Sequence, residues 1–114
     1  MNILLVDDEE DWRRTTAVLI LQLGHAVFEA TDADGAAAIL SRTPIDVLIT
    51  DIRLQGKSGD ILASEARAQQ PGIRLVFVTG DGTFPDPEAD PHGPFLLKKP
   101  VDPADLETAL NRAR

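Results

Sequence analysis

Ile3-Leu4-Leu5-Val6-Asp7-Asp8-Glu9, near the start of the chain, joins a short aliphatic run directly to three acidic residues. Four more short apolar runs follow at residues 26–30, 47–50, 75–79 and 95–97, and most are near-continuous rather than alternating. Near-continuous runs are typical of strands that are covered on both faces, as in a parallel sheet. The sequence therefore predicts five buried parallel strands.

Helix signals lie between these runs. The first helix is predicted to carry Glu9 in its first turn, and two further helices to begin at Asp32 and near Asp60. A last helix is capped by Asp102 and opened by Pro103. The first helix is expected to turn one stripe toward the core, made of Trp12, Thr16, Leu19 and Leu23. Alternating strands and helices with right-handed crossovers predict a doubly wound α/β sheet.

One interval breaks the alternation. Residues 81–93 contain Pro85, Pro87 and Pro91, and Pro94 follows. Proline removes a backbone donor and clashes inside a helix, so no helix longer than about one turn is expected there. A proline-rich loop is predicted in place of the helix between the fourth and fifth strands.

Length and composition narrow the class of protein. The 114 residues predict one domain over 1–114, and 43% apolar residues with few aromatics predict an aliphatic core. The absence of cysteine excludes a disulfide scaffold and a thiolate metal site, and a formal charge of −8 argues against nucleic-acid binding. No run approaches the ~20 apolar residues that span a bilayer, and the start lacks the features of a signal peptide. The expectation is an acidic cytoplasmic domain.

The residues that carry chemistry stand at the ends of the predicted strands. In a doubly wound sheet, ligands bind at the carboxyl ends of the strands. The candidates are Asp7, Asp8 and Glu9 after the first strand, Asp51 after the third, Thr79 ending the fourth and Lys99 ending the fifth.

Clustered carboxylates require a counter-charge. Two carboxylates ~5 Å apart repel by about 3 kcal/mol at an effective dielectric near 20. Lys99 supplies one positive charge, and Mg²⁺, which takes oxygen ligands, is the predicted further cation. A carboxylate beside a metal, a lysine and a hydroxyl predicts phosphoryl transfer to an aspartate, although spacing alone leaves open which aspartate is the acceptor.

Taken together, these motifs resemble a response-regulator receiver domain (CheY-like) over essentially the whole chain. The resemblance is carried by residues 3–9, by Asp46-Val47-Leu48-Ile49-Thr50-Asp51, by Val78-Thr79-Gly80 and by Lys99-Pro100. It implies a flavodoxin-like five-stranded sheet in the order 2-1-3-4-5. Phe77-Val78-Thr79-Gly80 and the proline-rich sequel are similar to a subfamily with an F-x-T-G motif and a labile fourth helix.

The resemblance also implies a magnesium site. Asp8 and Asp51 would be direct Mg²⁺ ligands, and Asp7 would act mainly through water. The backbone carbonyl of Arg53, two residues after Asp51, would be the third protein ligand.

By the same resemblance, Asp51 is the phosphoacceptor. Thr79 would bond one phosphoryl oxygen, Lys99 would pair with another, and Gly59 matches the family glycine before the third helix. Arg53 and Asp81 are hypothesised to pair across the mouth of the site and to hinder the water that hydrolyses the acyl phosphate.

The predicted function is a phosphorylation-dependent switch of a two-component system that accepts a phosphoryl group from a sensor histidine kinase or a phosphotransfer protein. No direct nucleic-acid or membrane contact is expected, and the protein is expected to catalyse only its own phosphorylation and dephosphorylation. Two alternatives remain. One is a phosphorylation-independent adaptor, or pseudo-receiver; the other is a haloacid-dehalogenase-like phosphatase, which would want a second acid where Arg53 stands.

Overall fold

The core of the fold is a five-stranded parallel sheet in the order β2-β1-β3-β4-β5. It is seen in a computed structural model that describes residues 1–54, 56–80, 95–99 and 101–112. The strands are β1 (Asn2–Val6), β2 (Ala26–Ala30), β3 (Val47–Asp51), β4 (Arg74–Thr79) and β5 (Phe95–Lys98). The predicted strands and their order are confirmed.

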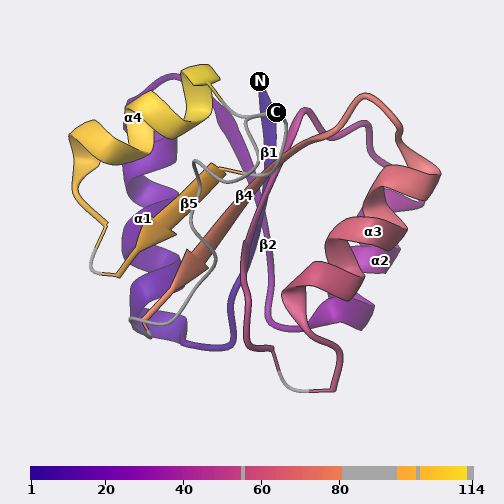
Figure 1. Cartoon of the computed structure of the whole chain (residues 1–114). Coiled ribbons are helices and arrows are strands. Elements are labelled where there is room, and N and C mark those ends of the chain that lie inside the picture. Colours follow the sequence, from indigo (N-terminus) through magenta and orange to yellow (C-terminus); the bar gives the residue numbers. More distant parts are fainter. Residues whose placement is uncertain (55, 81–94, 100, 113–114) are drawn as a thin grey trace.

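Helices cover both faces of this sheet (Figure 1). α1 (Glu10–Gln22) and α4 (Pro103–Arg112) lie on one face, and α2 (Ala33–Leu40) and α3 (Gly59–Gln69) lie on the other. Side chains of β1 alternate between the two cores, since Leu4 and Val6 join α2 and α3 whereas Ile3 and Leu5 join α1 and α4. No helix in the described ranges is long and apolar enough to cross a membrane.

Side-chain caps begin α2 and α4 where the sequence predicts. The Asp32 side chain accepts a hydrogen bond from the backbone N–H of Gly35 at 2.8 Å and so caps α2. Asp102 accepts from Ala104 N at 2.8 Å ahead of α4. Gly24 has φ +91°, a left-handed conformation that glycine adopts at little cost, and it turns the chain from α1 into β2.

The inward stripe of α1 differs from the prediction. Its buried residues are Arg13, Thr16, Ala17 and Ile20, whereas the predicted Trp12, Leu19 and Leu23 are only partly buried at the margins. Compared with the predicted stripe, the helix is rotated so that small Ala17 and branched Ile20 face the sheet. Arg13 can be buried because its guanidinium donates hydrogen bonds to Asp7 O and Glu29 Oε1.

The predicted proline-rich loop lies outside the described residues. The segment 81–94 separates β4 from β5 in the sequence, and the prediction of a reduced fourth helix stays a prediction.

Core packing predicts a contrast between two leucine truncations. Leu62 of α3 is 0% exposed, and Leu21 of α1 is 55% exposed. Leu62→Ala is expected to lower the free energy of unfolding by about 2–5 kcal/mol because it leaves a cavity. The matched Leu21→Ala is expected to change it by less than about 0.5 kcal/mol. Urea denaturation measures both, and equal losses would contradict the described packing.

Candidate functional site

The ammonium group of Lys99 lies between two carboxylates at the carboxyl end of the sheet. Its Nζ is 2.7 Å from Asp7 Oδ2 and 2.9 Å from Asp51 Oδ2. The Asp7 side chain is fully buried, and those of Asp51 and Lys99 are each 13% exposed. The ends of β1, β3 and β5 therefore bring three of the predicted residues into direct contact.

Backbone and side-chain hydrogen bonds fix the acidic loop after β1. Asp7 N donates to Ala30 O at 3.1 Å, and Asp7 Oδ1 accepts from Glu9 N at 2.8 Å. Buried Arg13 donates from Nη1 to Asp7 O at 3.0 Å and pairs through Nε with Glu29 Oε1 at 3.1 Å. Asp7 is thus held through its amide, its carbonyl and its carboxylate.

Arg13 is a positioning residue that the sequence analysis missed. Charged helix residues are usually solvated, so its residue type gave no reason to expect burial. The sequence holds one signal: Arg13 adjoins Trp12 and lies three residues before Thr16, and both of these belong to the predicted inward stripe.

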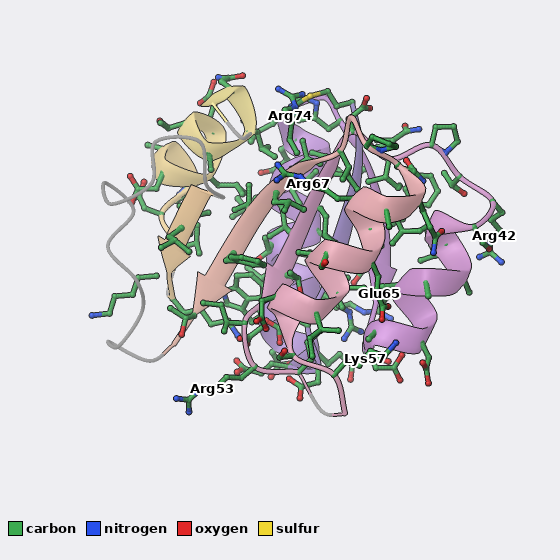
Figure 2. All side chains as sticks on the ribbon, turned by 45° about the vertical axis from the view of Figure 1, so that its right-hand side comes forward. Arg42, Arg53, Lys57, Glu65, Arg67 and Arg74 are labelled. Carbon is green, nitrogen blue, oxygen red and sulfur yellow. The ribbon has the colours of Figure 1, made fainter. Side chains whose placement is uncertain are left out.

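Asp51 is held by its neighbours in sequence. Its Oδ1 accepts a hydrogen bond from the backbone N–H of Arg53 at 2.9 Å, while Oδ2 faces Lys99. The connection that follows is tied to α3 by Lys57, whose Nζ is 2.9 Å from Glu65 Oε1 (Figure 2). The carboxylate is therefore fixed at both oxygens.

Gly59 allows α3 to begin directly against Asp51. Its N–H donates to Ile52 O at 2.8 Å. A Cβ at this position would lie 2.1 Å from Asp51 O and 3.0 Å from Ile52 Cα. Both atoms belong to the backbone, so the clash has no flexible side chain to absorb it. The glycine expected from the family resemblance is thus required by a close approach to the site.

Thr79 ends β4 beside this pair of carboxylates. Its side chain is buried, and its carbonyl accepts a hydrogen bond from Lys99 N at 2.8 Å. That bond continues the β4–β5 pairing by one step past the register of Thr79 with Lys98. Lys98 itself is exposed, so Lys99 is the lysine that enters the site, as strand alternation predicts.

Burial and ion pairing shift two pKa values in the site. Desolvation by burial raises the pKa of the Asp7 carboxyl, and the Lys99 hydrogen bond only partly opposes this. For Lys99, burial alone would lower the pKa, but hydrogen bonds and charges from Asp7 and Asp51 outweigh it and raise the pKa. The ammonium is consequently charged at neutral pH.

Other residues predicted for the site lie at its solvent-exposed edge, called the rim below. Asp8 is exposed, and Glu9 is 65% exposed with Oε1 3.8 Å from Lys99 Nζ. The Arg53 side chain is exposed and extends away from the body of the protein (Figure 2). Asp81, its hypothesised partner, lies outside the described residues.

The site suits a hard cation by its charge and its donor atoms. Lys99 balances only one of the charges of Asp7 and Asp51, and Asp8 and Glu9 add negative charge at the rim. Within the part of the chain that the structure describes, no three acidic, histidine or cysteine side chains converge into a ready-made metal site. A cation here would therefore need backbone carbonyl or water oxygens as well, which is the habit of Mg²⁺.

The family model for the response regulator receiver domain matches residues 3–111. The chain belongs to the response regulator receiver domain family. Receiver domains are the phosphorylation-dependent switches of two-component signalling, so the predicted fold and function class are confirmed. The family in general binds Mg²⁺ and works with histidine kinases or phosphotransfer proteins. The comparisons give no support to the two alternatives.

Individual relatives agree with this assignment. The chain is 31% identical to the transcriptional regulatory protein GlrR of Escherichia coli over 98% of its own length, but it spans only 26% of that protein. A CheY-like receiver domain from Methylobacillus flagellatus superposes with a TM-score of 0.86 at 27% identity, covering 97% of this chain and 96% of that one.

A third relative bears on the chemistry. A response regulator from Burkholderia pseudomallei, whose structure holds a phosphorylated aspartic acid, a calcium ion and citrate, superposes with a TM-score of 0.83. It is 25% identical and covers 96% of this chain and 65% of that one.

Replacement of Gly59 tests the close approach of α3 to Asp51. Gly59→Ala is expected to lower the free energy of unfolding by about 1–3 kcal/mol, because the new methyl group meets backbone atoms. Gly72→Ala is the matched control, since a Cβ there meets nothing within 4 Å. Chemical denaturation compares the two. Equal stability of the Gly59→Ala and Gly72→Ala variants would refute the described contact.

The raised pKa of Asp7 predicts a pH-dependent difference in stability. Between the unfolded value of 3.8 and the raised folded value, the folded state holds a proton that the unfolded state has lost. The contribution of Asp7 to the free energy of unfolding of the wild type therefore falls as the pH rises through this window. The stability of Asp7→Asn relative to wild type should increase with pH over the window and then level off, as measured by denaturation in chelator. A pH-independent difference would contradict the raised pKa.

Proposed function

We propose that residues 1–114 act as one receiver domain whose phosphoacceptor is Asp51. The observation that carries this proposal is the contact of one lysine with two aspartates, in which Lys99 Nζ lies 2.9 Å from Asp51 Oδ2 and 2.7 Å from Asp7 Oδ2. Asp51 is the member of this pair that keeps some solvent exposure. A phosphodonor reaches it more readily than the fully buried Asp7.

The chemistry follows from the neighbours of Asp51. A carboxylate oxygen of Asp51 attacks the phosphorus atom of a phosphohistidine. An O–P bond forms, the P–N bond breaks, and the imidazole leaves with the electron pair and takes up a proton. Lys99 remains beside the new acyl phosphate and stabilises its negative oxygens. The Arg53 N–H, 2.9 Å from Asp51 Oδ1, orients the attacking carboxylate.

Mg²⁺ is the proposed cofactor. Asp8 and Asp51 would hold it directly, Asp7 would hold it mainly through water, and the backbone carbonyl of Arg53 would complete the protein ligands. The family resemblance, the excess of negative charge and the oxygen-only donor set support this assignment. When bound, the ion would neutralise charge on the transferring phosphoryl group.

Thr79 is the proposed sensor of the phosphoryl group. It is buried at the end of β4, next to Lys99, whose backbone N–H donates a hydrogen bond to the Thr79 carbonyl. A hydroxyl that donates to a phosphoryl oxygen would pull the end of β4 toward Asp51. Such a local contact would favour one of two conformations and so transmit the signal.

The proposed phosphodonor is a sensor histidine kinase or a phosphotransfer protein, in the cytoplasm. Neither nucleic acid nor a membrane is proposed as a direct partner, in keeping with the acidic net charge of −8. The protein is proposed to catalyse only its own phosphorylation and dephosphorylation. This proposal is supported by Arg53, which stands where an aspartyl phosphatase of the haloacid-dehalogenase type would want a second acid.

Phosphorylation with a small-molecule phosphodonor tests the assignment of Asp51. Incubation with acetyl phosphate and Mg²⁺ should add one phosphoryl group to the wild type, as read by intact mass, and should add none to Asp51→Asn. Chelation of Mg²⁺ should abolish the gain. Asp34→Asn, which alters an exposed aspartate of α2, is the matched control and should be phosphorylated like the wild type.

Two outcomes would contradict the proposal. Phosphorylation of Asp51→Asn would move the acceptor to another residue. Sustained turnover of a generic phosphate ester by the wild type would make the protein an enzyme rather than a switch.

A further inference from the structure

Trp12 brings an aromatic ring to the lysine of the site. The Lys99 Nζ lies 4.6 Å from the centroid of the Trp12 ring, within the range of a cation–π contact. Trp12 comes from the first turn of α1, so the contact joins α1 to the end of β5. Its ring also packs at the margin of the core beneath α1 and α4, which fixes its place.

Among the described residues, the Trp12 ring gives the ammonium group a neighbour that is not a carboxylate. Lysine carries three donors, and Lys99 donates one hydrogen bond to Asp51 Oδ2 at 2.9 Å while it forms an ion pair with Asp7 Oδ2 at 2.7 Å. The ring offers a negative face of another kind. A π face attracts a cation without demanding a particular donor direction, whereas a carboxylate requires an aligned N–H. An ammonium over the ring can therefore exchange hydrogen-bond partners without leaving the site.

That freedom matters for phosphoryl transfer. Lys99 contacts Asp51 Oδ2 before the reaction, and after it the same ammonium must face oxygens of the phosphoryl group. The lysine stem is long and flexible, so a fixed platform limits the positions that its charge can take. Glu9, 65% exposed and 3.8 Å away, is too solvated to serve as that platform.

We propose that Trp12 is a positioning residue that holds the Lys99 ammonium over its ring while the ammonium passes from Asp51 to the phosphoryl group. This inference rests on the proposed function, but the contact itself exists before any phosphorylation. The two can therefore be tested separately.

The first test reads the contact alone. The chain contains one tryptophan, so growth of a tryptophan auxotroph on fluorotryptophan places fluorine at Trp12 only. The ¹⁹F resonance of the unphosphorylated protein should move by more than its linewidth in Lys99→Met. Lys98→Met, which alters the adjacent exposed lysine, should leave it in place. An unchanged resonance in Lys99→Met overturns the proposal.

The second test reads the effect on phosphorylation. Trp12→Leu keeps an apolar side chain but removes the π face, and its phosphorylation by acetyl phosphate should be about two- to five-fold slower than that of the wild type. Trp12→Phe keeps a weaker face and should give an intermediate rate. A leucine variant as fast as the wild type would overturn the proposal.

Graded fluorination keeps the test decisive if Trp12→Leu fails to fold. Fluorine withdraws electron density from the face of the ring and changes the shape of the side chain very little, so it weakens the attraction of the ring for a cation. The rate of phosphorylation by acetyl phosphate should therefore fall stepwise from tryptophan to monofluorinated and then to trifluorinated tryptophan at position 12. A flat series overturns the proposal. If the wild type accepts no phosphoryl group at all, the proposed function fails, and the resonance measurement still decides the contact.

Discussion

The arrangement of this site depends on one cation placed between two carboxylates. Without the Lys99 ammonium, the carboxylates of Asp7 and Asp51 would lose the cation that lies between them at the carboxyl end of the sheet. Repulsion of that kind costs several kcal/mol in a partly buried site, a large share of the stability of a small domain. The sheet can bring these acids together because β5 delivers a lysine to the same edge.

Parallel pairing is what gathers these groups. All five strands run in the same direction, so residues that end β1, β3, β4 and β5 meet at one rim although they are far apart in the sequence. The two aliphatic cores on either face then hold the rim in place. Within this rim, backbone N–H groups and Lys99 together position the carboxylates of Asp7 and Asp51.

The sequence predicted this rim because its signals are local and independent of packing. An aliphatic run followed by acids marks a strand end, and Asp32 and Asp102 mark helix starts because their side chains accept hydrogen bonds from nearby backbone N–H groups. The burial of Arg13 and the ring contact of Trp12 could not be predicted in this way. Both depend on the rotation of α1 about its axis, which is set by how Ala17 and Ile20 fit the sheet.

Rotation of α1 links packing to chemistry. Turning the helix so that Ala17 faces the sheet buries Arg13 against the carbonyl of Asp7 and brings Trp12 toward Lys99. One helix thus contacts both the acidic loop, through Arg13 and Asp7 O, and the Lys99 ammonium, through the Trp12 ring. Since Arg13 and Trp12 are adjacent in the sequence, a shift of α1 would disturb both supports at once. The orientation of α1 is therefore a functional property of this domain as well as a feature of its core.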